Sequence, residues 1–342
     1  MEVVYKLERK LASIQVIDDL WEIPGADLLL GARIEGWNCV VLKSEFSRIG
    51  EKCVYFEIDS VLPKADWTEF LHNDYRIKTK KFRGQISQGV AKPLDKLPLP
   101  KNREYHVGDD VTDLLGVTKW EPPASFQQGA YKGDFPSIYG IRKTDEMRIQ
   151  SVLPVLDELS GNPYYISQKM DGTSFTAYID PKTNEFEVCS RNMRIKKDSN
   201  SVYWKFALSE DIENKLRKYP SVCIQGELCG EDIQGNKIGI HGLDLYVFNA
   251  YDLCSCKYYD YNGLIRSVQD LGLKTVPILE EGSCFKYTLD ELQNIADNGR
   301  YNNGRYQEGI VVRSSNNQWS STLGGLLSFK VLNRNFLLKY DE

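Results

Sequence analysis

The first hundred residues show short apolar runs separated by residues that favour turns. Two of these runs, 38–42 and 53–58, are rich in β-branched, aromatic and cysteine side chains. Turn-forming residues bound them, among them Pro24, Gly25, Gly36 and Gly50. Several short strands at this spacing predict a small barrel or sandwich and not a βαβ unit.

The rest of the chain predicts an α+β domain built largely on antiparallel sheet. A stretch rich in Pro, Gly and aromatic residues, 121–140, is predicted to be a linker between residues 1–120 and a second domain, 141–342. Helical periodicity favours helices over 144–159, 208–218 and 288–298. Strands are predicted over 164–169, 174–179, 186–190, 222–228, 243–251, 309–313 and 327–332.

Composition is that of a globular protein, with 42% hydrophobic and 27% charged residues among 342. No run approaches the roughly 18 apolar residues of a membrane span. The N-terminus has no signal-peptide core, so we expect an intracellular protein, cytoplasmic or nuclear, that is not secreted. The eight cysteines lack the spacing of a zinc site and are expected to be reduced.

Positive charge is concentrated although the net charge is −5. Residues 76–103 hold nine Lys and Arg against one acid, and a second basic cluster lies at 191–197. Such clusters are either solvated faces or tracks for a phosphate backbone. A small barrel with a basic, aromatic-bearing surface is typical of an OB-fold. The candidate RNA-binding residues are Arg76, Lys78, Lys80, Lys81 and Arg83.

Candidate chemistry begins with Lys169-Met-Asp171-Gly172, which follows an apolar strand. A neutral lysine amine is a good nucleophile, but with a reference pKa of about 10.4 it is rarely neutral near pH 7. Four residues of this kind also occur in ordinary strand-turns. Further strands carry charged residues that alone would suit a sheet edge, namely Arg191, Glu227, Glu308 and Lys330, and one strand carries the aromatic Phe248.

Together these segments resemble the covalent nucleotidyltransferase superfamily of ligases and mRNA-capping enzymes. KMDG, SRN, GELCG, YVFN, EGIVV and SFKV stand in the order of that superfamily's motifs I, Ia, III, IIIa, IV and V. The chain is most similar to ATP-dependent RNA ligases of the T4 RNA ligase 2 type, in the subgroup with an N-terminal OB domain. The segments TDEMRIQ and GELCGEDIQGN, and the strings IPGAD, EGW and YFEIDSVLP, carry this closer resemblance.

The resemblance implies a role for each matching residue. Lys169 would attack ATP and carry AMP, with Lys330 as the second catalytic residue, neutralising the α-phosphate and depressing the pKa of Lys169. Asp171 and Glu308 would hold Mg²⁺ or Mn²⁺, directly or through water, in a site that keeps several waters. The residues expected to bind the nucleotide are Arg148, Arg191, Glu227, Phe248, Glu308 and Lys330.

One position departs from the family pattern. Motif V usually has a second lysine two residues after the first, and here Leu332 stands there. The second phosphate contact is then expected from Arg334, Lys339 or Arg148.

The implied function is an RNA ligase that joins 3′-OH and 5′-phosphate RNA ends, acting as a monomer in RNA repair or sealing. DNA ligases and capping enzymes place an OB domain after motif V, and only twelve residues follow Lys330 here. NAD-dependent ligases carry nicotinamide-binding and zinc modules that the sequence lacks. The rival from another class is a non-catalytic RNA-binding protein with a degenerate nucleotidyltransferase domain. Intact Lys169, Glu227, Glu308 and Lys330 argue against it.

Overall fold

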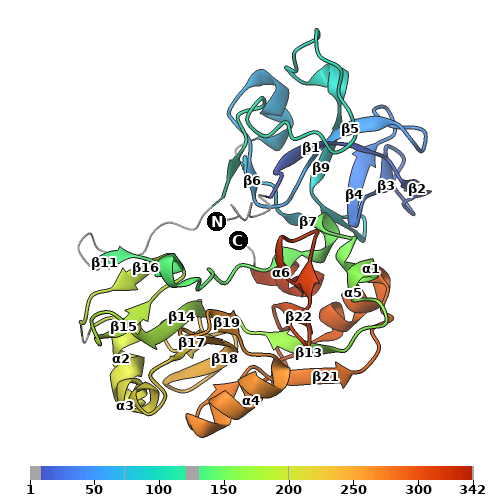
Figure 1. Ribbon diagram of the computed structural model, residues 1–342. Coiled ribbons are helices and arrows are strands. Elements are labelled where there is room, and N and C mark those ends of the chain that lie inside the picture. Colours follow the sequence, from blue (N-terminus) through green and yellow to red (C-terminus); the bar gives the residue numbers. More distant parts are fainter. Residues whose placement is uncertain (1–8, 73, 121–130, 199, 341–342) are drawn as a thin grey trace. The chain divides into compact units, whose positions relative to one another are not determined.

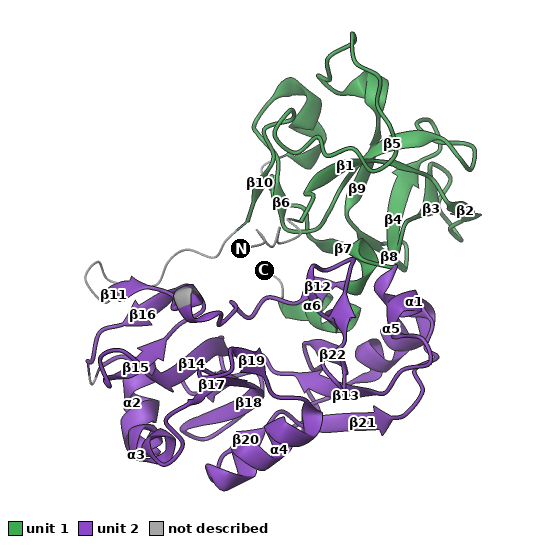
Figure 2. Ribbon diagram, in the orientation of Figure 1, with its two compact units in different colours: residues 1–123, 149–153, 334–342 green, residues 124–148, 154–333 purple. Residues whose placement is uncertain are grey.

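The computed structural model describes residues 9–72, 74–120, 131–198 and 200–340 (Figure 1). The first ten residues of the predicted linker, 121–130, lie outside these ranges. No helix within the described ranges is long and apolar enough to cross a membrane. The chain divides into two compact units (Figure 2): unit 1 takes residues 1–123, 149–153 and 334–342, and unit 2 takes residues 124–148 and 154–333.

Unit 1 consists of short antiparallel strands around a small apolar core. Side-chain alternation in β4 points Trp37, Cys39 and Val41 inward, and each is less than 5% exposed. The sheets have the orders β1-β5-β9, β2-β3-β4, β7-β8 and β10-β6. The strands are β1 (Ala12–Val16), β2 (Asp19–Glu22), β3 (Leu29–Ile34), β4 (Trp37–Leu42), β5 (Lys52–Phe56), β6 (Ser60–Val61), β7 (Thr79–Phe82), β8 (Gln85–Gln88), β9 (Val90–Pro93) and β10 (Thr118–Lys119). The predicted strands 38–42 and 53–58 are thus confirmed as β4 and β5, within two residues at each end.

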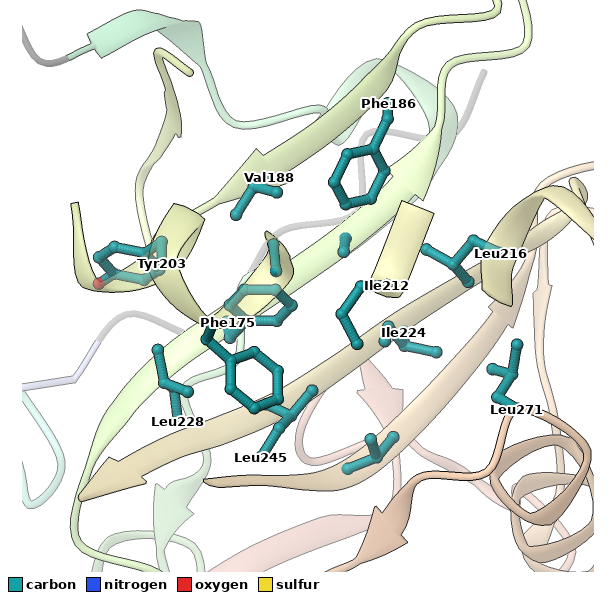
Figure 3. Close-up of a cluster of buried hydrophobic side chains, with 14 of the residues drawn as sticks. Phe175, Phe186, Val188, Tyr203, Ile212, Leu216, Ile224, Leu228, Leu245 and Leu271 are labelled. Carbon is teal, nitrogen blue, oxygen red and sulfur yellow. The ribbon is translucent and has the colours of Figure 1, made fainter. Parts of the chain in front are cut away.

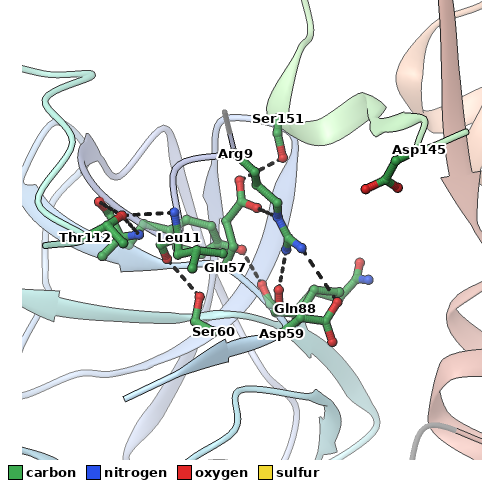
Figure 4. Close-up of polar contacts among 12 residues, drawn as sticks. Arg9, Leu11, Glu57, Asp59, Ser60, Gln88, Thr112, Asp145 and Ser151 are labelled. Carbon is green, nitrogen blue, oxygen red and sulfur yellow. Dashed lines mark hydrogen bonds and ion pairs between the residues drawn. The ribbon is translucent and has the colours of Figure 1, made fainter. Parts of the chain in front are cut away.

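A buried carboxylate ties segments of unit 1 that lie far apart in the chain (Figure 4). Glu57 is 5% exposed; it forms an ion pair with Arg9 and accepts a hydrogen bond from Ser151 Oγ at 2.7 Å. Ser151 belongs to the 3₁₀ helix η4 (Ile149–Ser151), which therefore packs with the N-terminal strands. The remaining helices of unit 1 are η1 (Asp66–Leu71), η2 (Leu94–Lys96) and α6 (Arg334–Tyr340).

Unit 2 contains two larger sheets. One has the order β11-β16-β15-β14-β17-β18-β19, with β20 beside β18, and the other has the order β12-β25-β22-β13-β21. The strands of the first are β11 (Tyr131–Asp134), β14 (Thr173–Ile179), β15 (Phe186–Cys189), β16 (Met193–Ile195), β17 (Val222–Gly230), β18 (Leu243–Asp252), β19 (Lys257–Tyr258) and β20 (Lys274–Thr275). Those of the second are β12 (Met147–Arg148), β13 (Tyr164–Lys169), β21 (Ile278–Gly282), β22 (Gly309–Ser314) and β25 (Ser328–Leu332), and a separate hairpin pairs β23 (Trp319–Ser320) with β24 (Gly325–Leu326).

The first sheet of unit 2 is covered on one face by helices and buries a large apolar core (Figure 3). Phe175 of β14 is fully buried and makes an edge-to-face contact with Phe206, with ring centroids 5.7 Å apart. Ile212 and Leu216, one helical turn apart, also point into this core. The helices of unit 2 are η3 (Ser137–Tyr139), α1 (Val155–Leu159), α2 (Val202–Ser209), α3 (Ile212–Arg217), α4 (Tyr261–Asp270) and α5 (Leu289–Asn298).

The strands predicted from residue 164 onward are all confirmed, but two of the predicted helices are wrong in extent. Residues 144–159 do not form one helix, because Met147 and Arg148 pair with β25 as strand β12 and Pro154 separates η4 from α1. The predicted helix 208–218 is interrupted at Asp211, which has φ 52°. The third, 288–298, is confirmed as α5, which begins with a reciprocal cap between Thr288 and Glu291.

Candidate active site

A cavity of about 300 Å³ in unit 2 gathers polar residues from both of its large sheets. The second sheet contributes the ends of β13, β22 and β25, and the first contributes β14, β17 and β18. The walls therefore contain strand residues held by two ladders of backbone hydrogen bonds. The lining residues are Thr144, Asp145, Glu146, Ser167, Gln168, Lys169, Met170, Gly172, Thr173, Ser174, Arg191, Glu227, Gln234, Phe248, Val276, Glu308, Val311, Arg313 and Lys330.

Strand register places Lys169, Glu308 and Lys330 together. Lys169 ends β13 opposite Gly309 of β22, and Lys330 of β25 lies opposite Val311 of β22. Glu308 directly precedes β22, and its Oε2 is 2.7 Å from Lys169 Nζ. The pairing of β13, β22 and β25 therefore brings these three residues, which lie far apart in the sequence, into one cluster.

Gly172 lets this strand end approach the opposite sheet. A Cβ added at this position would lie 2.4 Å from the backbone oxygen of Leu228 and 2.9 Å from Cγ of Glu227. Both distances are too short for a real Cβ contact. The glycine of the KMDG motif is therefore required because β17, which carries Glu227, passes directly against it.

Three carboxylates lie near Lys169: Glu227 and Glu308 line the cavity, and Asp171 interacts electrostatically with both. Burial and the neighbouring carboxylates Glu308 and Asp171 raise the pKa of Glu227 to about 8, although Lys169 opposes the shift. Burial and Glu308 likewise raise the pKa of Asp171 to about 6, against the pull of Lys237, whose Nζ is 3.0 Å from Asp171 Oδ2. Negative charge is thus in excess around the lysine amine.

This excess corrects the expectation that the pKa of Lys169 is depressed. Burial lowers the pKa of Lys169, but the fields of Glu308 and Glu227 and the hydrogen bond to Glu308 outweigh burial, so its pKa is raised above the ordinary value. Lys330 is expected to help depress this pKa, but it does not outweigh the carboxylates. Its own pKa falls to about 8 because of burial and the nearby cations Lys169 and Arg148, although Asp145 raises it. Without a ligand, Lys169 is a protonated ion-pair partner.

Asp145 joins two of the predicted nucleotide-binding cations. Its carboxylate forms ion pairs with Arg191 and, at 3.3 Å, with Lys330 Nζ. Arg148 lies in register beside Lys330 through the parallel pairing of β12 with β25. Of the three residues considered as substitutes for the second motif V lysine, Arg148 therefore neighbours Lys330 within unit 2, whereas Arg334 and Lys339 belong to α6 of unit 1.

The end of the cavity formed by Phe248 is closed by a buried ion pair that sequence reasoning missed. Arg313 is 8% exposed, its guanidinium carbon is 5.4 Å from the centroid of the Phe248 ring, and its Nη2 is 2.8 Å from Glu146 Oε1. Glu146 lies in the TDE segment already noted for its resemblance, and Arg313 is a charged residue inside the apolar strand β22. A charge at that position is the signal that could have identified it.

Asp171 and Glu308 are the side chains expected to bind a divalent cation. The part of the chain that the structure describes has no group of three Asp, Glu, His or Cys side chains arranged to hold a metal ion. Asp171 and Glu308 nevertheless both lie near Lys169 and raise its pKa, and Glu308 also raises the pKa of Asp171. Two carboxylates fit a magnesium-like ion that keeps several waters and do not fit a fully protein-coordinated one.

The candidate RNA-binding cations of unit 1 differ in exposure. Arg76 is 8% exposed, with its guanidinium 2.8 Å from Asp59 and stacked 3.5 Å from the Trp120 ring centroid. Lys78 is half-buried and lies 3.5 Å from Asp74. By contrast, the tip of the β7–β8 hairpin is exposed to solvent, and the residues there include Lys80, Lys81, Phe82 and Arg83.

Comparison with known proteins accounts for both units. A family model for RNA ligase matches residues 162–332, and a model for an OB-fold domain matches residues 11–94. The chain belongs to the RNA ligase family. The RNA ligase model spans all of the strands that carry Lys169, Glu227, Glu308 and Lys330, and the OB-fold match confirms the barrel predicted for the N-terminal part.

Solved structures of another RNA ligase extend the match over almost the whole chain. A mutant of the Naegleria gruberi RNA ligase with AMP and Mn is 32% identical, with a TM-score of 0.85, covering 97% of this chain and 99% of that one. Another mutant with ATP and Mn gives the same identity and TM-score over 98% and 100%. The enzyme with PPi is 33% identical, with a TM-score of 0.84 over 98% and 99%. A search of curated proteins gave no match.

Proposed function

We propose that the protein is an ATP-dependent RNA ligase that joins 3′-OH and 5′-phosphate RNA ends through lysyl-AMP and RNA-adenylate. The observation that carries this is the cluster of Lys169, Glu227, Glu308 and Lys330 in one cavity with the Phe248 ring. Family membership supports RNA as the substrate. The AMP, ATP and Mn of the Naegleria structures support the nucleotide and the metal.

In the first step, the neutral amine of Lys169 attacks the α-phosphorus of ATP, forming an N–P bond while pyrophosphate leaves. Glu308 Oε2 accepts the hydrogen bond of Lys169 Nζ and orients the amine. Lys330 faces the same end of the cavity and neutralises the α-phosphate, so that charge developing on its oxygens is stabilised.

The other end of the cavity holds the nucleoside. Phe248 offers its ring to adenine, and Glu227 accepts hydrogen bonds from the ribose hydroxyls. Arg191 and Arg148 complete the contacts to the nucleotide and its phosphates. Asp171 and Glu308 would hold a divalent cation, largely through water, which when bound would offset their negative charge and so lower the pKa of Lys169.

The two remaining steps transfer AMP from Lys169 to the 5′-phosphate of an RNA end and then join the ends. The adjoining 3′-OH attacks the activated 5′-phosphorus and releases AMP. We assign RNA binding to the OB domain, residues 1–120, and the nucleotide chemistry to the nucleotidyltransferase domain, 141–342. Of the linker predicted between them, 121–140, residues 131–140 contain β11 and η3 of unit 2. The basic residues of that OB domain and its exposed Phe82 suit contacts that track a phosphate backbone.

We further propose that the ligase acts inside the cell as a monomer. All eight cysteines are free, and five of them are buried, which suits a reducing compartment. The mass of the purified protein by light scattering checks the monomer. A mass twice that of the 39.2 kDa chain would contradict it.

The decisive experiment is covalent labelling. The protein is incubated with ATP labelled at the α-phosphate and with Mg²⁺ or Mn²⁺, then separated on a denaturing gel beside Lys169→Ala. Label on the wild type that is absent from Lys169→Ala is expected. Wild-type protein that takes up no label, after treatment with pyrophosphate to remove any AMP already attached, would refute the proposed function.

A further inference from the structure

A cationic loop lies beside the Lys169 end of the cavity, and none of the roles assigned above involves it. It connects α5 to β22 (Figure 1) and has the sequence Gly-Arg-Tyr-Asn-Asn-Gly-Arg-Tyr-Gln over residues 299–307. It contains no acid. Arg300 and Arg305 are both exposed on it.

The base of the loop is fixed to the reacting residues. Tyr301 is 4% exposed, and its hydroxyl donates to the backbone oxygen of Lys169 and accepts the backbone N–H of Glu308, each at 3.2 Å. Arg300 and Tyr306 pair across the base of the loop as an antiparallel bridge. The buried side chain of Tyr301 therefore fixes the position of the loop relative to Lys169 and Glu308.

The tip of the loop is fixed to a second loop. Asn303 Nδ2 donates to the backbone oxygens of Lys237 and Ile238, at 3.0 and 2.7 Å. Lys237 in turn reaches Asp171 at 3.0 Å. Gly239 leaves room for this contact, since a Cβ there would lie 2.8 Å from Asn303 Nδ2. An exposed loop of two arginines would be expected to move freely, yet this one is held at both ends.

Its side chains are arranged as a surface for phosphates. The guanidinium carbon of Arg300 lies 3.7 Å from the centroid of the Tyr306 ring, so the cation is stacked. Its Nη1 donates to the backbone oxygens of Asp297 and Gly299, at 3.2 and 2.9 Å, which leaves Nε and Nη2 to contact an anion. Arg305 is exposed at the opposite side of the loop, with long contacts of 3.4 Å to the backbone oxygens of Asn236 and Lys237. The carboxylates nearest in sequence, Asp297 and Glu308, face the helix end and the cavity: Gln293 Nε2 donates to Asp297, and Lys169 pairs with Glu308.

We propose that the 299–307 loop binds the phosphate backbone of the RNA strand at the reacting end, with Arg300 and Arg305 as the phosphate contacts. The inference rests on the proposed function, because it names how that site holds its second substrate. The phosphates could also be the β- and γ-phosphates of ATP. Exposure favours RNA, because both arginines lie on the surface whereas the residues lining the cavity are largely half-buried.

The test uses Arg300→Ala/Arg305→Ala in the full chain. Binding of a fluorescein-labelled nicked RNA duplex is measured by anisotropy over a salt series, in parallel with the KM for ATP in self-adenylylation. Two lost phosphate contacts should flatten the slope of log affinity against log salt by about 1.4 to 1.8, which corresponds to about 25-fold weaker binding or more at 0.1 M salt. The KM for ATP should stay within about two-fold of the wild type.

The matched control is Arg217→Ala/Lys218→Ala, which removes two exposed cations at the end of α3 and changes the net charge equally. The control should bind RNA like the wild type. A raised KM for ATP with an unchanged salt slope would assign the arginines to ATP and overturn the inference. Equal RNA binding by both double variants would also overturn it. Failure of the wild type to label with AMP would instead contradict the proposed function.

Discussion

The Glu146–Arg313 ion pair closes one end of the cavity, and its removal should destabilise unit 2 measurably. Glu146→Gln removes one charge from a pair 2.8 Å apart and leaves the guanidinium of Arg313, whose side chain is 10% exposed, without its carboxylate. Breaking a buried pair from one side costs about 3 to 5 kcal/mol. Because the Glu146 side chain is 25% exposed and Ser328 Oγ remains 3.1 Å from Arg313 Nε, we expect the lower figure, about 3 kcal/mol.

The assay is thermal unfolding of a double-mutant cycle. A loss of about 3 kcal/mol corresponds to about 6 to 12 °C in the melting temperature of a domain of this size. Arg313→Met should cost a similar amount, and the double variant should lose clearly less than the sum because it leaves no buried charge. Since Arg313 lies over Phe248, each variant should also raise the KM for ATP in self-adenylylation.

The exposed pair of Glu213 with Arg217 on α3, 2.7 Å apart, is the control. Glu213→Gln should cost no more than about 0.5 kcal/mol, because exposed pairs on one helix contribute little. Additive losses in the Glu146 and Arg313 cycle, or a loss in Glu146→Gln no larger than in Glu213→Gln, would refute the reasoning that burial makes this pair matter.

Three further predictions follow from the cavity and the hairpin. Lys330 loses its charge as the pH rises through its pKa of about 8, so AMP affinity measured by calorimetry should fall more steeply above that pH in the wild type than in Lys330→Arg, in which Glu227, whose pKa is also about 8, still titrates; parallel curves would contradict this. Gly172→Ala should abolish covalent labelling while lowering the melting temperature by only about 2 to 12 °C, since overpacking costs about 1 to 3 kcal/mol; a labelled variant would show that β17 can move. Charge reversal at Lys80 and Lys81 should weaken RNA binding and flatten its salt dependence while sparing self-adenylylation, and loss of both activities would argue against a separate RNA role.

The strands and the order of the site residues could be predicted because they are local. Strand β13 occupies the same residues, 164–169, that its apolar pattern predicted, and the glycine after Lys169 signals the turn into β14. The KMDG and EGIVV strings each place a charged residue at the end of a strand, and GELCG places Glu227 inside the apolar strand β17. Sheet pairing then brings these strands together, and six of the predicted site residues line the cavity: Lys169, Arg191, Glu227, Phe248, Glu308 and Lys330.

Features set by contacts between distant segments could not be predicted. Met147 and Arg148 form a strand only because β25 offers them a parallel partner, so the helical periodicity of 144–159 was misleading. The sequence predicts the cation Lys330 near Lys169, but it does not show that folding also places the carboxylates Glu308 and Glu227 close enough to raise the pKa of Lys169. The burial of Arg76 depends on Asp59 and Trp120, which the basic pattern of 76–103 does not reveal.

The ion pair between Lys169 and Glu308 also has a consequence for the chemical selectivity of the resting enzyme. Only a neutral amine reacts with aldehydes, active esters or acyl phosphates, and Glu308 keeps this amine protonated. A ligase without bound nucleotide should therefore resist acylation and glycation at Lys169, the lysine that forms the covalent bond to AMP. The same contact that delays the enzyme's own reaction thus protects the nucleophile from reactive metabolites until the nucleotide and the metal arrive.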